Sequence, residues 1–133
     1  MGTLSLIFAK NVKKVIGVEC VKEAIEDAKE NARKNSIENV EFTCQVAEKF
    51  IATMPAIDLA LLNPPRKGCQ PQFLESLVEL KPKRIIYISC DPATLARDLS
   101  YLTRSRYRIE TATPFDMFPQ TAHVETVVSL AQI

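Results

Sequence analysis

The sequence lacks three features that would assign it to a common class of proteins. None of its four cysteines forms a C-x-x-C pair, and their spacings match no zinc framework, so no structural metal site is expected. No apolar run reaches the roughly 18 residues that cross a membrane. No basic segment precedes an apolar stretch at the N-terminus, as a secretory signal requires. We therefore expect a cytoplasmic chain with reduced thiols, no bound metal and no membrane partner.

An excess of charge of either sign is also missing. Seventeen basic and sixteen acidic residues give a net charge of +1, which supplies no strong field for nucleic acid. If the substrate is RNA, much of the affinity must come from elsewhere. The 133 residues, 47% of them apolar and 25% charged, indicate one globular domain with a core of its own.

What the sequence does contain is an alternation of short apolar runs with amphipathic segments, which is typical of an α/β sheet. We expect strands at residues 15–19, 40–44, 57–62, 84–89, 107–112 and 124–130, and helices at residues 4–10, 21–35, 47–53, 73–80 and 93–102. The last two strands have no helix between them, which indicates an antiparallel hairpin. The ten-residue loop at 114–123 has a length that is often functional.

Five candidate site residues follow from position in this pattern. Ligands of open α/β sheets bind beyond the carboxyl ends of the strands. Glu19, Asn63 and Cys90 each follow or end an expected strand. The final strand begins near His123 and Glu125, after the long loop.

Cys90 lies between an apolar strand and a helix N-terminus. Aligned backbone N–H groups there favour the thiolate and lower the pKa of a thiol, which would make Cys90 a nucleophile. The alternative is a small buried hydrophobic residue. Cys20, Cys44 and Cys69 lack this setting together with an acid opposite, and we interpret them as structural.

Glu125 lies inside an apolar strand run. Burial there would raise the pKa of its carboxyl group toward the range of a general base, although an outward-facing charge on an edge strand remains the alternative. His123, two residues earlier, would share a strand face with Glu125 and could orient it, contact substrate or lie on the surface. Glu19 has the position at which nucleotide-binding folds place an acid for the ribose, or it is a charge at a helix start. Gly2 is the one glycine left of the loop that such a site needs.

Four segments carry a family resemblance. ISCDPATLARDL at residues 88–99 resembles the nucleophile motif of the RNA (uracil-5-)-methyltransferases, and DMFPQTAHVETV at 116–127 resembles their closing motif. NPPRKG at 63–68 is similar to their Asp-Pro-Pro-Arg-x-Gly loop, with Asn63 in place of the aspartate. VKKVIGVE at 12–19 resembles their second-strand motif.

The resemblance implies a Rossmann-like class I fold that uses S-adenosyl-L-methionine to methylate C5 of a uridine in transfer RNA or 23S ribosomal RNA. Cys90 would attack C6 of the uracil and Glu125 would remove the C5 proton. The resemblance implies these cofactor contacts: Gly2, Thr3, Glu19, Val46 and Asn63. It implies these substrate contacts: Pro64, Pro65, Arg66 and His123.

The resemblance also implies that residues 1–133 are a partial methyltransferase catalytic domain, N-terminally truncated within the cofactor's glycine loop, with the first, central strand missing. Unpaired strand edges are costly. We therefore expect either that residues 3–9 substitute as a strand or that a second copy of the chain covers the gap. Two rival functions remain: an amino-group methyltransferase that uses the Asn-Pro-Pro-Arg loop, and an inert fragment that acts as a binding module.

Overall fold

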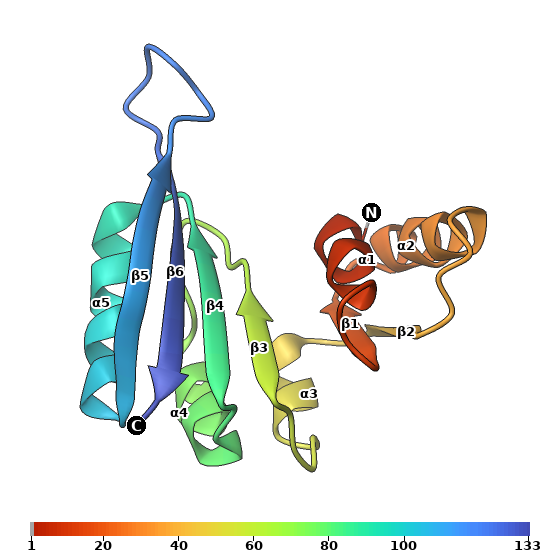
Figure 1. Ribbon diagram of the computed structural model, residues 1–133, viewed down its shortest axis with the longest axis horizontal. Helices are drawn as coiled ribbons and strands as arrows, with labels where there is room; N and C mark the ends of the chain where they lie inside the picture. The colour runs from red at the N-terminus through yellow and green to blue at the C-terminus, as the bar shows by residue number, and fades with distance from the viewer. Residues whose placement is uncertain (1) are drawn as a thin grey trace. The chain divides into compact units, whose positions relative to one another are not determined.

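The computed structural model describes residues 2–133 of the chain. The chain divides into two compact units, Met1–Phe50 and Ile51–Ile133, whose elements are labelled in Figure 1. Each unit contains parallel strands linked through helices. The expected α/β class is therefore confirmed.

The first unit is built on two parallel strands. Its elements are α1 (Thr3–Ala9), β1 (Val15–Glu19), α2 (Lys22–Lys34) and β2 (Val40–Cys44). The predicted bounds of both strands are confirmed, and Val15 pairs with Val40 at the start of the ladder. The apolar run of β1 indicates a buried strand, but only Gly17 of β1 is buried. A two-stranded sheet has too few neighbouring strands to cover its members.

The segment Thr3–Ala9 is an α-helix, so the expectation that it substitutes as a strand is wrong. Leu6 and Ala9 lie three residues apart and are both buried, which is the spacing of one helical face. The Leu6 amide donates to the Gly2 carbonyl at 3.0 Å and closes the first turn. The helix expected at residues 4–10 is confirmed, and coverage of the strand edges by a second copy stays a prediction.

The second unit is a four-stranded sheet with helices on one face. The short helix α3 (Ala47–Ile51) leads into it. Its further elements are β3 (Leu59–Leu62), α4 (Pro71–Leu80), β4 (Arg84–Ser89), α5 (Pro92–Arg104), β5 (Tyr107–Phe115) and β6 (Glu125–Gln132). The strand order is β3-β4-β6-β5, with β3 parallel to β4 and β6 antiparallel to both of its neighbours. The antiparallel closing hairpin is thereby confirmed.

The hairpin is longer than the sequence indicates. β5 continues through Pro114 to Phe115, where the sequence predicts a loop from residue 114. Proline has no N–H to donate, but β5 is the edge strand of this sheet, and an edge strand tolerates proline. The hairpin loop therefore contains residues 116–124.

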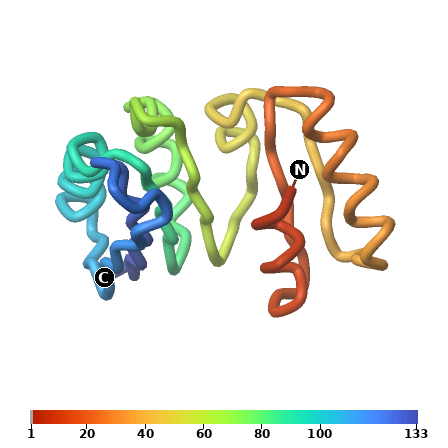
Figure 2. Tube along the Cα trace, turned by 90° about the horizontal axis from the view of Figure 1, so that it is seen from above, coloured from red at the N-terminus to blue at the C-terminus, as the bar shows by residue number. Residues whose placement is uncertain are grey.

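The core of the second unit lies between the sheet and helices α4 and α5, which Figures 1 and 2 show on the same face. Alternate residues of the two central strands are fully buried: Ile85, Tyr87, Val128 and Leu130. They pack in one cluster with Leu77 and Leu102 of the helices. A fully buried aliphatic side chain contributes roughly 1.5–3 kcal/mol, so this core fixes the strand ends that follow it.

Candidate functional site

The topology of the second unit brings three predicted residues to one edge of the sheet. β3 and β4 run parallel, so Asn63 and Cys90 both follow carboxyl ends at that edge. β6 runs antiparallel, so its first residue, Glu125, lies there too. Ser89 pairs with Thr126, and the next residues along the two strands are Cys90 and Glu125. A thiol and a carboxylate therefore lie on neighbouring strands at the place where ligands of such sheets bind.

The turn that carries Cys90 is held by two hydrogen bonds between the residues on either side of it. The buried Ser89 hydroxyl donates to the Asp91 carbonyl at 2.9 Å and accepts from the Asp91 amide at 3.1 Å. These two bonds enclose Cys90, whose side chain is half-buried. Cys90 thus sits on a short turn that has little freedom to move.

Asp91 caps helix α5 directly after Cys90. Its Oδ1 accepts from the Thr94 amide at 2.9 Å, and Pro92 occupies the first helical turn. The Thr94 amide, followed by the Thr94 hydroxyl and the charge of Arg66, outweighs the opposing effect of desolvation and lowers the pKa of Asp91. The acid beside the thiol is therefore held ionised, with one oxygen committed to the helix.

Glu125 is half-buried at the start of β6, where it pairs with Phe115 of β5. The prediction that His123 shares its strand face is wrong, because β6 begins only at Glu125. His123 lies exposed in the loop, and its amide donates to the Thr121 hydroxyl at 3.2 Å. A role for His123 in binding substrate stays a prediction.

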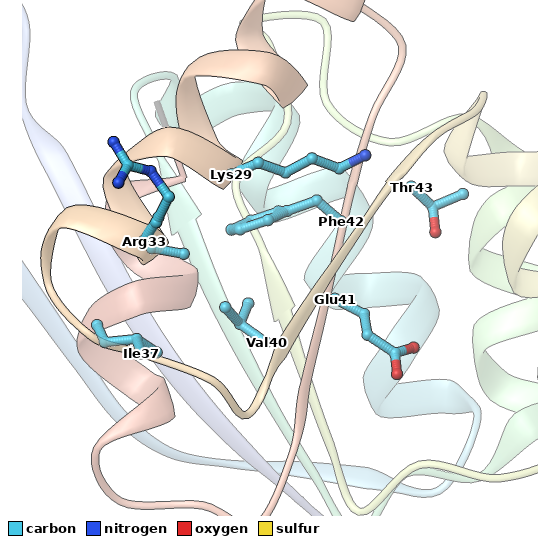
Figure 3. Close-up of a pocket in the computed structure, with 8 residues that line it drawn as sticks. Lys29, Arg33, Ile37, Val40, Glu41, Phe42 and Thr43 are labelled. Atoms are coloured by element: carbon cyan, nitrogen blue, oxygen red, sulfur yellow. The ribbon is translucent and has the colours of Figure 1, made fainter.

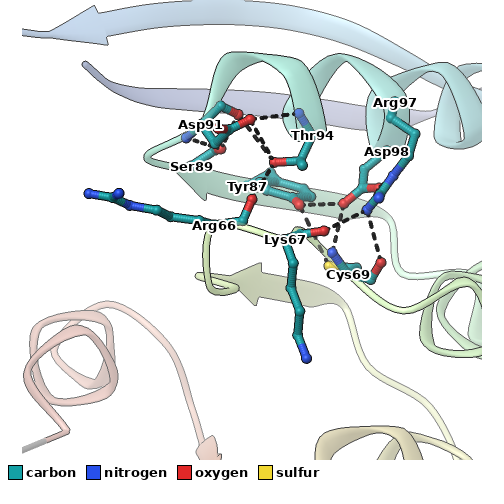
Figure 4. A network of polar contacts seen from close by, with 9 residues as sticks. All are labelled: Arg66, Lys67, Cys69, Tyr87, Ser89, Asp91, Thr94, Arg97 and Asp98. Carbon is teal, nitrogen blue, oxygen red and sulfur yellow. Dashed lines mark hydrogen bonds and ion pairs between the residues drawn. The ribbon is translucent and has the colours of Figure 1, made fainter. Parts of the chain in front are cut away.

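The loop after β3, residues 63–69, has no regular secondary structure but is bound along its backbone to α5 (Figure 4). Gly68 adopts φ 74°, a left-handed conformation, and its amide donates to the Pro65 carbonyl at 2.9 Å. The Thr94 hydroxyl donates to the Arg66 carbonyl at 2.8 Å. The predicted substrate segment, Pro64 to Arg66, is thus tied to the helix that follows Cys90.

Sequence reasoning missed a buried polar cluster behind this loop. Asp98 is 1% exposed, and its carboxylate accepts from Tyr87, Cys69 and Arg97. Burial, followed by the hydrogen bond to Asp98, raises the pKa of Tyr87 far above its usual value. A signal was present, because Asp98 lies at helical spacing between the buried Leu95 and Leu102.

In the first unit, Glu19 ends β1 with an exposed carboxylate. Its Oε1 accepts from the Cys20 amide at 2.8 Å and the Val21 amide at 3.2 Å. Desolvation alone would raise the pKa of Glu19, but the hydrogen bonds from Val21 and Cys20 outweigh it and lower the pKa. Glu19 is therefore an ionised acceptor, and its second carboxylate oxygen can accept hydrogen bonds from hydroxyl groups. Val46 is 46% exposed just before α3.

Gly2 caps α1 in a left-handed conformation, with φ 64°, and Thr3 begins the helix as an exposed residue. A Cβ on Gly2 would lie 2.7 Å from the Ala28 Cβ and 2.9 Å from the Phe42 ring. Close packing thus requires glycine here whether or not it contacts a cofactor.

A hollow of about 520 Å³ lies in the first unit between α2 and β2 (Figure 3). Its lining residues are Lys29, Ala32, Arg33, Ile37, Val40, Glu41, Phe42 and Thr43. None of the predicted site residues belongs to this set.

Across residues 2–133, no three His, Cys, Asp or Glu side chains are arranged to hold a metal ion. Over the same residues, no helix is long and apolar enough to cross a membrane.

Comparison with known proteins decides the family. The model of the tRNA (uracil-5-)-methyltransferase family matches residues 1–133, the whole chain. The chain belongs to this family. An uncharacterised RNA methyltransferase of Clostridium acetobutylicum is 48% identical over 99% of the chain, and the chain spans 30% of that relative's length.

Two solved structures confirm the class I methyltransferase fold expected from the family resemblance. The Pyrococcus abyssi tRNA (uracil-54, C5)-methyltransferase, solved with S-adenosyl-L-homocysteine, is 34% identical with a TM-score of 0.84. The match covers 98% of this chain and 32% of that one. A ribosomal RNA methylase of Streptococcus thermophilus is 17% identical, with a TM-score of 0.76 over 99% of this chain and 81% of its own, and shows the fold alone.

Proposed function

We propose that the protein containing this chain transfers a methyl group from S-adenosyl-L-methionine to C5 of a uridine in transfer or ribosomal RNA. The observation that supports the proposal is the register of β4 and β6, in which Ser89 pairs with Thr126 at the ligand edge of the sheet and Cys90 and Glu125 are the next residues. The match of the whole chain to the uracil-5-methyltransferase family supports the same chemistry.

In the proposed reaction, the Cys90 thiolate adds to C6 of the uracil and its electron pair forms a C–S bond. The electrons of the C5–C6 double bond move onto C5, which becomes an enolate-like carbon nucleophile. Uracil C5 is too weakly nucleophilic without this covalent step. When bound, S-adenosyl-L-methionine supplies the methyl group that C5 takes. Glu125 then removes the C5 proton, the electrons restore the C5–C6 double bond, and the C–S bond breaks to release Cys90.

The chain offers a suitable acceptor for the cofactor. Glu19 is exposed and ionised, and only its Oε1 is engaged by the turn amides, so Oε2 can accept from ribose hydroxyl groups. Two hydroxyls facing one carboxylate form charge-assisted hydrogen bonds. Gly2, Thr3, Val46 and Asn63 stay predicted cofactor contacts, by the family resemblance. That residues 1–133 form one catalytic domain stays a prediction as well.

The proposed substrate contacts centre on the loop of residues 63–69. Arg66 is exposed while its carbonyl is held by Thr94, so the guanidinium is available to an RNA phosphate or to the target base. An enzyme that reacts with both faces of a uracil ring must first take that base out of its stack.

The decisive experiment uses the full-length protein, S-adenosyl-L-methionine and RNA that contains 5-fluorouridine. Fluorine at C5 cannot be removed as a proton, so the covalent adduct accumulates and mass spectrometry should locate it on Cys90. Cys90→Ala should abolish the adduct. Cys44→Ala, which removes an exposed thiol of the first unit, should leave it unchanged.

Two results would overturn the proposal. Methylation of an exocyclic amine that survives Cys90→Ala would support an amino-group methyltransferase instead. Absence of cofactor binding by calorimetry, even at about millimolar S-adenosyl-L-methionine (a dissociation free energy near 4 kcal/mol), would support a binding module without activity.

A further inference from the structure

We propose that Asp98, together with Tyr87 and Arg97, is a positioning group that holds the loop of residues 63–69 on α5. The Pro64–Arg66 segment of this loop thereby keeps a fixed position relative to Cys90. The inference rests on the proposed function for its chemical consequence. Figure 4 shows the three side chains converging behind the loop.

Asp98 binds three groups from three different parts of the chain. Its Oδ2 accepts from the Tyr87 hydroxyl at 2.6 Å and from the Cys69 amide at 2.8 Å. Its Oδ1 accepts from Arg97 Nε at 2.9 Å. Tyr87 belongs to β4 and Cys69 to the loop, so one buried carboxylate joins strand, loop and helix.

Side chains of helix α5 also bind the backbone carbonyl groups of the loop. Arg97 Nη2 donates to the carbonyls of Lys67 at 3.0 Å and Cys69 at 3.2 Å. The Thr94 hydroxyl donates to the carbonyl of Arg66 at 2.8 Å. A loop without regular secondary structure thereby has three carbonyls and one amide bound by a single helix.

Gly68 shows how closely the loop approaches the carboxylate. A Cβ on Gly68 would lie 2.7 Å from Asp98 Oδ2 and 2.6 Å from Arg97 Nη2, distances that real Cβ atoms do not adopt. The left-handed φ of 74° adds a second reason for glycine at this position. The backbone of the loop therefore rests directly on the Asp98–Arg97 pair.

This arrangement suits positioning better than stabilisation. The Arg97 side chain is 56% exposed, so solvent screens its attraction to Asp98 and the ion pair adds little net stability. The same helix begins at Pro92, two residues after Cys90, with Asp91 as its cap, so α5 ties the proposed nucleophile and the loop to one rigid element. The side chains of Arg66 and Lys67 point away from α5 in Figure 4, which leaves two cations for RNA phosphates.

The test compares two tyrosines that each donate one buried hydrogen bond. Tyr87→Phe removes the bond to Asp98, whereas Tyr107→Phe removes a 2.8 Å bond to the Pro82 carbonyl, at the opposite end of β4 from Cys90. Asp98→Asn is the stronger variant, because its amide cannot accept from all three donors. Each variant is made in the full-length protein.

Two readouts separate positioning from stability. In Tyr87→Phe and Asp98→Asn, amide hydrogen exchange at Cys69 should become faster, and the rate of adduct formation on 5-fluorouridine RNA should fall at least tenfold. Tyr107→Phe should lower the melting temperature to a similar extent as Tyr87→Phe, with wild-type adduct rate and wild-type exchange at Cys69.

The outcomes distinguish this inference from the proposed function. A wild-type protein that forms no adduct rejects the proposed uracil chemistry, and exchange at Cys69 then still reports whether Asp98 holds the loop. If the wild type forms the adduct but Tyr87→Phe matches Tyr107→Phe in both rate and exchange, the positioning role is wrong.

Discussion

Two strand-to-helix turns of this chain place a cysteine beside an acid, and they use the acid in opposite ways. Between β1 and α2, Glu19 precedes Cys20, and Glu19 Oε1 accepts from the Cys20 thiol at 3.4 Å. That hydrogen bond, followed by the negative charge of Glu19, raises the pKa of Cys20. Between β4 and α5, the acid follows the cysteine, and Asp91 Oδ1 is engaged by Thr94 instead.

The helix caps differ in the same way. Val21 caps α2 without a side-chain hydrogen bond, whereas Asp91 caps α5 and Ser89 closes the turn around Cys90. At the first turn the acid is directed at the sulfur, which favours the protonated thiol of Cys20. At the second turn the acid is directed into the helix.

The largest expected difference between the turns is catalytic. Cys90→Ala should lower methyl transfer to RNA by about 10⁴-fold or more, because the covalent step is lost. Cys20→Ala should change the rate by less than about twofold, since the protonated thiol of Cys20 takes no part in the reaction. The measurement is transfer of a labelled methyl group by the full-length protein. Comparable losses in both variants would break the comparison.

The second difference concerns the caps. Asp91→Ala should lower the melting temperature by about 4 °C, because the Thr94 amide loses its acceptor. Val21→Ser should raise it by about 2–4 °C, because a hydroxyl would supply the cap that α2 lacks. Differential scanning calorimetry measures both. If Asp91→Ala raised the melting temperature, or Val21→Ser lowered it, the proposed difference between the two helix caps would be wrong.

The cap of α5 also has a defined pH dependence. The pKa of Asp91 is lowered in the folded protein, so its contribution is present above the ordinary value of 3.8 and is lost as the pH falls through the folded-state pKa. The difference in melting temperature between wild type and Asp91→Ala should therefore shrink on acidification below that value.

The smallest expected effect is on the reactivity of Cys20. Glu19→Gln weakens the hydrogen bond and removes the negative charge that together raise the pKa of Cys20, so alkylation of Cys20 by iodoacetamide at pH 8 should become faster. Glu23→Gln, which changes an acid in the first turn of α2, is the matched control. Peptide mapping by mass spectrometry reports each cysteine separately. Equal Cys20 rates in Glu19→Gln and wild type would show that the acid does not suppress this thiol.

Much of the fold could be predicted, because short apolar runs mark the strands. The expected bounds of β1, β2 and β4 agree with the structure. The exceptions have local causes: β5 accommodates Pro114 because it is an edge strand, and α4 begins at Pro71, two residues earlier than expected, because proline suits a first helical turn. The strand expected at residues 3–9 came from the family resemblance, and the helical spacing of Leu6 and Ala9 prevailed.

The site could be predicted only where position in the sheet determines it. Cys90 and Asn63 follow parallel strands, and the antiparallel return of β6 brings Glu125 to them. Asp98 was missed because a charged residue in a helix usually faces solvent, and only its spacing from Leu95 and Leu102 revealed otherwise. The hydrogen bonds that bind the loop of residues 63–69 are made to backbone atoms, which sequence patterns do not encode.

The strand order also constrains how the molecule is made. β6 lies between β4 and β5 although it follows both in the chain, so β5 has no neighbour in this sheet until β6 inserts. On the ribosome, a domain emerges from its N-terminus, so Cys90 leaves the exit tunnel before Glu125, which follows 35 residues later in the chain. The nascent chain then holds a thiol without its proposed base. The proposed catalytic pair would be assembled in a single step, when β6 pairs with β4 and β5 and completes the sheet.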